Sequence, residues 1–131
     1  MSDPRALPAS RRFASVPSSV AAARAFVAEV LGDLPGELCA DAALAVSELA
    51  TNAIVHAGSD FEVRIERDGS RVTVRVADSG PGGPEVRSPQ ATEAHGRGLQ
   101  IVRTMASAWG VEHSPQELGK AVWFTLEVAA R

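Results

Sequence analysis

The sequence predicts an α+β fold, a two-layer α/β sandwich in which helices cover one face of a mostly antiparallel sheet. Three observations lead to this prediction. The first half of the chain carries two apolar patterns with helical spacing, the middle carries two alternating segments joined by a short turn, and the last third carries two more alternating segments. Each predicted strand has one apolar and one polar face, so the sheet needs cover on one side only.

The start of the chain predicts a leader, an edge strand and a helix. Residues 1–10 are rich in Pro, Ser and Ala and predict a mobile leader, so the folded domain is expected to span residues 11–131. Residues 12–16 match a short edge strand. Between residues 18 and 31, apolar side chains recur at helical spacing, and Gly32 follows as a stop signal.

A second helix is predicted from Pro35 to about His56, ending before Gly58, because Pro favours helix starts and Gly favours the position past a helix end. Glu48 and Asn52 are four residues apart and therefore share one face of this helix, with His56 continuing the row. Such a pair is also common among ordinary solvent-facing residues. The opposite side is expected to face the core and carries Ala42, Ala45, Val46, Leu49 and Ala53.

Four segments alternate between apolar and polar residues and predict the main strands of the sheet. Residues 61–66 and 72–76 form a hairpin with a turn at Asp68-Gly69. The last two strands are expected around Val111 and at residues 121–128. The alternation gives each of these strands one face for the core.

Residues 78–98 break the pattern, since they hold five glycines and three prolines, and a third helix is predicted to start near Gly98. A loop of this length is unusual in a small domain and is usually functional. In residues 80–83 the glycines let the backbone approach a flat ring, and in residues 95–99 they expose a helix N-terminus to phosphates. Flexible turns would look the same, and neither segment matches the Walker or Rossmann spacing.

Asp78 has the same strand parity as the buried valines before it, so its side chain is expected on the helix-covered side of the sheet. A carboxylate there is costly unless it accepts hydrogen bonds. It is either the cap of the turn that follows or the acceptor for an N–H group of a ligand, and an adenine amine would fit.

Composition narrows the classes of function. The chain has 131 residues, a net charge of −3 and 45% apolar residues, which fits one domain with a real core and argues against general attraction to nucleic acid. The single cysteine, Cys39, excludes an internal disulfide and is expected to be a small core residue. Apolar runs look too short to cross a membrane and the N-terminus lacks a signal core, so a cytoplasmic protein is expected.

The motifs are specific as an ordered set: Glu-x-x-x-Asn on a helix, a hairpin, Asp-x-Gly-x-Gly at a strand end, a long loop, then Gly-x-Gly-Leu at a helix start. This set resembles the Bergerat-type (GHKL) ATP-binding fold shared by gyrase, Hsp90, histidine kinases and MutL. Within that fold, residues 47–56 are most similar to bacterial anti-sigma factor serine kinases. The resemblance covers nearly the whole chain after the leader.

The resemblance implies roles for three side chains. Asn52 would be the Mg²⁺ ligand, with an amide oxygen suited to that hard cation. Glu48 would be the general base that activates a hydroxyl nucleophile, and Asp78 would bind the adenine of ATP.

The resemblance also assigns the glycine-rich segments. Gly80 and Gly82 would lie beneath the base, and residues 83–95 would form a lid over the triphosphate. The phosphate-binding box would contain Gly96, Arg97, Gly98 and Leu99. One position departs from the pattern: several related families carry Thr directly after the glycine that precedes the last strand, and here Gly119 is followed by Lys120. Lys120 either replaces that contact or is a solvated lysine at a strand start.

Three functions are compatible with these motifs. The first is an anti-sigma factor-type serine/threonine kinase that uses ATP and Mg²⁺, phosphorylates an anti-anti-sigma (STAS-type) partner and sequesters a sigma factor, as a monomer or a homodimer, without direct nucleic-acid or membrane contact. The second is a nucleotide-dependent protein-binding module with little turnover. The third is a domain without a ligand. The chain is too short for the transducer domain of gyrase, Hsp90 and MutL, and no histidine precedes His56 to act as the phosphoacceptor of a sensor kinase.

Overall fold

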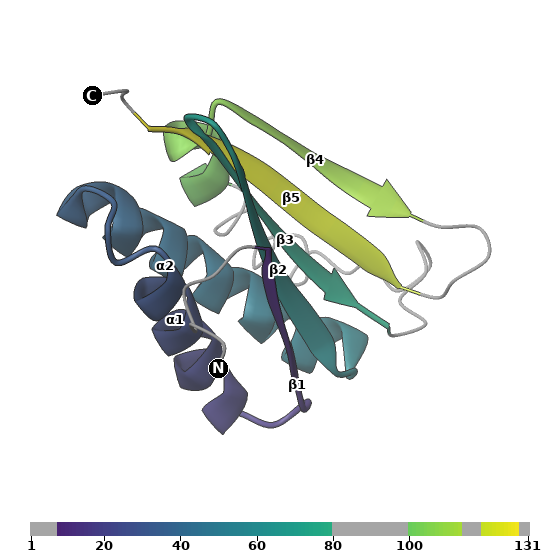
Figure 1. The fold of residues 1–131 in the computed structure, drawn as a ribbon. Helices are drawn as coiled ribbons and strands as arrows, with labels where there is room; N and C mark the ends of the chain where they lie inside the picture. Colours follow the sequence, from purple (N-terminus) through teal and green to yellow (C-terminus); the bar gives the residue numbers. More distant parts are fainter. Residues whose placement is uncertain (1–7, 80–99, 114–118, 129–131) are drawn as a thin grey trace.

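Five antiparallel strands form one sheet in the order β1-β2-β3-β5-β4, and helices α1 and α2 lie on the same face of it (Figure 1). The computed structural model describes residues 8–79, 100–113 and 119–128. Within them, the elements are β1 (Ala9–Phe13), α1 (Ser18–Val30), α2 (Gly36–Asn52), the π-helical turn η1 (Ala53–Ala57), β2 (Phe61–Asp68), β3 (Arg71–Asp78), β4 (Ala108–His113) and β5 (Lys120–Glu127). Residues 100–105 are also helical. The predicted α+β class is confirmed.

The core lies between the helices and one face of the sheet. On β2 and β3, alternate side chains are at most 5% exposed, whereas their neighbours in sequence are half-buried or exposed. The register places Phe61 opposite Asp78 and Val63 opposite Val76, so the end of β3 that carries Asp78 lies beside the start of β2. Alternation therefore directs Asp78 to the helix-covered face, as predicted.

Helix α2 is the central helix of the layer, and its Ala-rich side allows close approach. Ala42, Ala45 and Val46 are fully buried. The sequence predicted one α-helix to about His56, but residues 53–57 form a π-helical turn that ends at Gly58, with φ of 62°. A π-helical turn changes the angular spacing of side chains, so α-helical spacing alone does not place His56 relative to Glu48 and Asn52, and the predicted row stays a prediction there.

The edge strand lies earlier in the chain than the predicted window of residues 12–16. Ala9 and Ser10, which the sequence assigned to the leader, pair with Ile65 and Arg64 of β2. The ring of Phe13 explains this position, because it stacks on Phe61 with centroids 5.3 Å apart and anchors the strand at its end. The chain then turns towards α1, with a hydrogen bond from Val16 N to the Ala14 carbonyl.

One helical stretch, Gly36–Ala57, is long and apolar enough by length and composition to cross a membrane, with 22 residues and a mean hydropathy of 1.4 in its most apolar window. The expectation that every apolar run is too short was therefore wrong for this segment. Half of that window is buried inside the domain, where it packs against the sheet and α1. Core helices of globular domains share this composition because they must bury most of their surface.

Candidate functional site

Asn52 is a buried amide at the end of α2. Its side chain is 5% exposed, and its Nδ2 atom has no hydrogen-bond partner among the described residues. Leaving a buried polar atom unsatisfied costs about 1–3 kcal/mol, so such an atom is unusual in a folded protein unless a ligand or water completes it. A half-turn about the Cβ–Cγ bond exchanges the amide oxygen and nitrogen, so the same position can present an oxygen to a cation.

Asp78 lies across a small cavity from Asn52. The cavity is lined by Leu49, Asn52 and Ala53 from the helical layer and by Val76, Asp78, Lys120 and Val122 from the sheet. Its volume is about 10 Å³, which is roughly the room that one water molecule needs. The structure therefore brings together two of the side chains that the sequence singled out, in a largely apolar setting.

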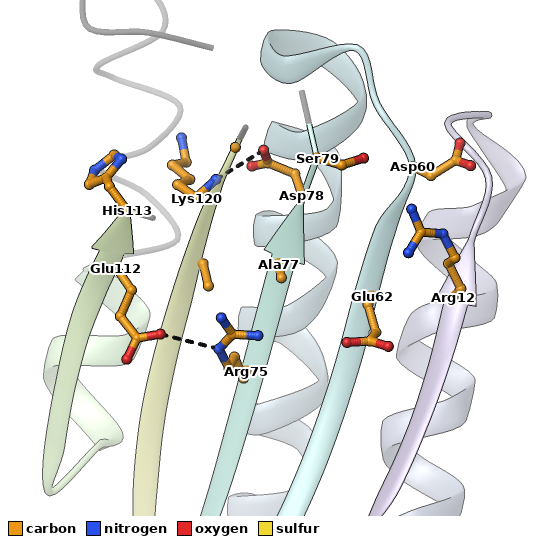
Figure 2. A pocket seen from close by; sticks show the side chains of 12 residues that line it. Arg12, Asp60, Glu62, Arg75, Ala77, Asp78, Ser79, Glu112, His113 and Lys120 are labelled. Carbon is orange, nitrogen blue, oxygen red and sulfur yellow. Dashed lines mark hydrogen bonds and ion pairs between the residues drawn. The ribbon is translucent and has the colours of Figure 1, made fainter. Parts of the chain in front are cut away.

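The carboxylate of Asp78 is held by the start of β5. Its Oδ1 atom accepts a hydrogen bond from the backbone N–H of Lys120 at 3.3 Å (Figure 2). The residue before, Gly119, has φ of +97°, and a Cβ atom there would lie 2.8 Å from that same Oδ1. Only glycine fits this conformation without moving the carboxylate. Lys120 is half-buried and borders the cavity, and the two alternatives for its side chain, a phosphate contact or a solvated lysine, stay predictions.

Glu48 lies one turn before Asn52 on α2 and is half-buried. Its neighbour Ser47 is buried and donates to the Leu44 carbonyl at 2.7 Å, and Thr51 donates to the Ser47 carbonyl at 2.9 Å. These local bonds satisfy the hydroxyls within the helix. Glu48 therefore lies one helical turn from the buried Asn52 amide and remains partly accessible to solvent.

A second and larger groove lies on the other face of the sheet and was not predicted from the sequence. Its volume is about 750 Å³. Figure 2 shows Glu62, Arg75 and Glu112 on this face, with the helices behind the sheet, and the Nε atom of Arg75 donates to Glu112 at 3.3 Å. The groove meets the small cavity at Asp78 and Lys120, which border both. Strand alternation gives a sequence signal for this face, because polar and charged residues occupy most of the outward positions of β1, β2 and β3.

The other predicted site residues lie outside the described part of the chain. These are Gly80, Gly82, Gly96, Arg97, Gly98 and Leu99, together with the lid expected at residues 83–95. Their roles stay predictions. Among the described residues, no group of three or more His, Cys, Asp or Glu side chains is arranged to hold a metal ion. A cation here would thus need ligands beyond such a cluster, as the Asn52 prediction implies.

Comparison with known proteins identifies the domain. No curated protein matches the chain. A family model described as a histidine kinase-like ATPase domain matches residues 13–126, which run from the last residue of β1 to the penultimate residue of β5. This match spans most of the chain and agrees with the antiparallel sheet covered by helices on one side. The chain therefore belongs to the histidine kinase-like ATPase domain family.

Proposed function

We propose that this ATPase-family domain is a cytoplasmic serine/threonine protein kinase of the anti-sigma factor type, which phosphorylates an anti-anti-sigma (STAS-type) protein and sequesters a sigma factor. The observation that carries the proposal is the arrangement of three side chains: Asn52 and Asp78 border one cavity, and the half-buried Glu48 lies one helical turn from Asn52. The similarity of residues 47–56 to anti-sigma factor kinases supports the choice of substrate class.

The described residues fit a magnesium nucleotide in two respects. The Asn52 amide is buried and incompletely hydrogen-bonded, and Asp78 offers a carboxylate acceptor in a slot with apolar walls. When bound, Mg²⁺ would neutralise charge on the phosphate oxygens. In this proposal Asn52 supplies an oxygen to the cation, and Asp78 accepts a hydrogen bond from the purine amine.

The reaction that follows is a direct phosphoryl transfer. Glu48 accepts the proton of a serine hydroxyl, the serine oxygen forms a bond to the γ-phosphorus of ATP, and the bond between that phosphorus and the bridging oxygen of ADP breaks. The products are phosphoserine, ADP and a proton held on Glu48. Since positioning and charge neutralisation account for most of the rate of such reactions, one base beside the bound nucleotide is sufficient.

The cavity between Asn52 and Asp78 is small compared with a nucleotide. A volume of about 10 Å³ is far below the 300 Å³ or more of typical ligand pockets. This cavity has room for one small group between Asn52 and Asp78, so a bound purine would need space beyond it.

The proposal is tested by mixing the protein with γ-labelled Mg-ATP and a purified STAS-type protein and measuring phosphoserine. The expected result is transfer by the wild type and loss of at least a hundredfold in rate for Glu48→Gln, because general bases typically contribute about 10²–10⁴-fold. Thermal shifts with Mg-ATP should be the same for both proteins. Glu29→Gln, an exposed carboxylate change on α1, is the matched control and should transfer at the wild-type rate.

Two outcomes would contradict the proposal. Wild-type rates in Glu48→Gln would remove Glu48 from its role. Binding of Mg-ATP and of the partner without loss of the γ-phosphate would instead identify a nucleotide-dependent protein-binding module. The homodimer expected from the resemblance stays a prediction.

A further inference from the structure

We propose that the solvent-facing stripe of α2 around Glu48 docks the protein substrate, and that this partner presents a basic and apolar surface to it. We define the α2 stripe as Glu37, Asp41, Leu44 and Glu48 of α2 together with Val55 of the adjoining turn η1. The inference rests on the proposed kinase function and adds to it the surface and the chemistry by which the substrate is selected.

The first observation is an apolar pair that flanks Glu48. Leu44 of α2 is 44% exposed and Val55 of η1 is 65% exposed, whereas Val46 and Leu49 of α2 are at most 4% exposed. Leu44 lies four residues before Glu48, one turn away on the same face of α2, and Val55 follows in the π-helical turn η1. Along the helix axis, Glu48 therefore lies between two exposed hydrophobic side chains.

The second observation is uncompensated negative charge. Glu37 and Asp41 are exposed on the same side of α2, and α2 contains no lysine or arginine. Neither Glu37 nor Asp41 has an ion pair among the described residues. The polar face of the sheet differs, because there Arg64 pairs with Glu66 and Arg71 pairs with Glu127. A partner surface with arginine or lysine beside apolar residues would complement the α2 stripe in both charge and hydrophobicity.

The third observation is geometric and indicates that the protein substrate itself covers the α2 stripe. A general base must lie within about 3.2 Å of the proton that it takes, so a substrate hydroxyl must reach the side chain of Glu48. One helical turn is about 5.4 Å, which places Leu44 about one turn and Val55 about two turns from Glu48 along the axis. A protein contact of ordinary size covers about 800 Å² on each partner and extends further than this. A folded substrate whose contact is centred on Glu48 would therefore cover Leu44 and Val55.

The test uses two labelled synthetic peptides with a central serine, one flanked by arginine and leucine and the other with glutamate in place of each arginine. Binding is measured by fluorescence anisotropy with protein saturated with a non-hydrolysable Mg-ATP analogue. The arginine peptide should bind at least tenfold more tightly than the glutamate peptide, and its affinity should fall as salt concentration rises. Leu44→Arg, Val55→Arg and Asp41→Lys should each weaken its binding at least tenfold.

Matched controls separate docking from general surface effects. Val16 has the same exposure as Leu44, 44%, but lies before α1, so Val16→Arg should leave peptide binding unchanged. Glu29→Lys on α1 is the corresponding control for Asp41→Lys. Thermal shifts with Mg-ATP should remain at the wild-type value in all five variants, because none of these residues borders the nucleotide cavity.

Several results would overturn the inference. Equal binding of the two peptides, binding of neither, or the same loss in Val16→Arg as in Leu44→Arg would each show that the α2 stripe does not select this chemistry. A wild-type dimer that becomes a monomer in Leu44→Arg would assign the stripe to self-association. Failure of the underlying kinase proposal is distinguishable, since it would appear as absence of phosphoserine on a STAS-type protein while peptide binding still depends on Leu44 and Val55.

Discussion

Gly119 fixes the position of the Asp78 carboxylate from the neighbouring strand: a Cβ atom at residue 119 would lie 2.8 Å from Oδ1 of Asp78 and would clash with its backbone carbonyl. The next residue donates its backbone N–H to the same Oδ1. One side of the carboxylate is thus set by the backbone of residues 119–120, and this relationship leads to the first prediction.

Gly119→Ala should destabilise the protein and weaken nucleotide binding together. The φ of +97° lies in a region that favours glycine, with a cost of about 1–2 kcal/mol for other residues, and the added methyl group must displace Asp78. Urea unfolding and thermal shift with Mg-ATP measure the two effects. Gly36→Ala is the matched control, because nothing lies within 4 Å of a Cβ there, and it should leave both quantities near wild type.

Asp78→Asn should separate binding from folding. The asparagine oxygen can still accept the Lys120 N–H, so the free energy of unfolding should change by no more than about 1 kcal/mol. Loss of the carboxylate acceptor should raise the dissociation constant for ATP at least tenfold, about 1.4 kcal/mol. Isothermal titration calorimetry measures it. An unchanged ATP affinity would show that Asp78 serves only to hold the turn.

Asn52→Leu should leave the nucleotide-free protein as stable as wild type or stabilise it by about 1–2 kcal/mol, because it removes a buried nitrogen that has no partner among the described residues. The same change should abolish the magnesium-dependent part of ATP binding. Chemical denaturation and calorimetry with and without Mg²⁺ test both statements.

Ser47→Ala is the control for that variant. The Ser47 hydroxyl is buried but already donates to the Leu44 carbonyl, so its removal should bring no gain in stability and no change in ATP affinity. If Asn52→Leu destabilises the protein as a broken hydrogen-bond network would, the amide has a structural role.

Cys39 should react slowly with alkylating reagents. It was expected within the core but is half-buried against it, and burial raises the pKa of its thiol, with a smaller contribution from the negative charge of Asp33. The neutral thiol is favoured in the folded state, so its contribution to stability is present below the ordinary thiol pKa and is lost as pH rises through the raised value. Iodoacetamide labelling at pH 8.5 should be slower than for free cysteine and slower than for the urea-unfolded chain. Equal labelling rates for the folded and the unfolded chain would contradict the raised pKa of Cys39.

The sequence by itself determined the class of fold and the direction of most side chains. Alternation in residues 61–66 and 72–76 is a local property of a strand, and it predicted which side of the sheet Asp78 faces. Helical spacing likewise predicted the buried side of α2. These patterns follow from backbone geometry that each segment carries alone.

The tertiary structure decided which side chains from distant segments come into contact, because such contacts depend on packing and register. Only the packed domain shows that Asn52 is buried rather than solvent-facing, that it shares a cavity with Asp78, and that Gly119 holds that carboxylate in place. The packed domain also has its edge strand at Ala9–Phe13, where the ring of Phe13 stacks on Phe61. Its last helical turn, Ala53–Ala57, is π-helical rather than α-helical. No periodicity within one segment encodes such contacts, since their free energy depends on side chains from several elements at once.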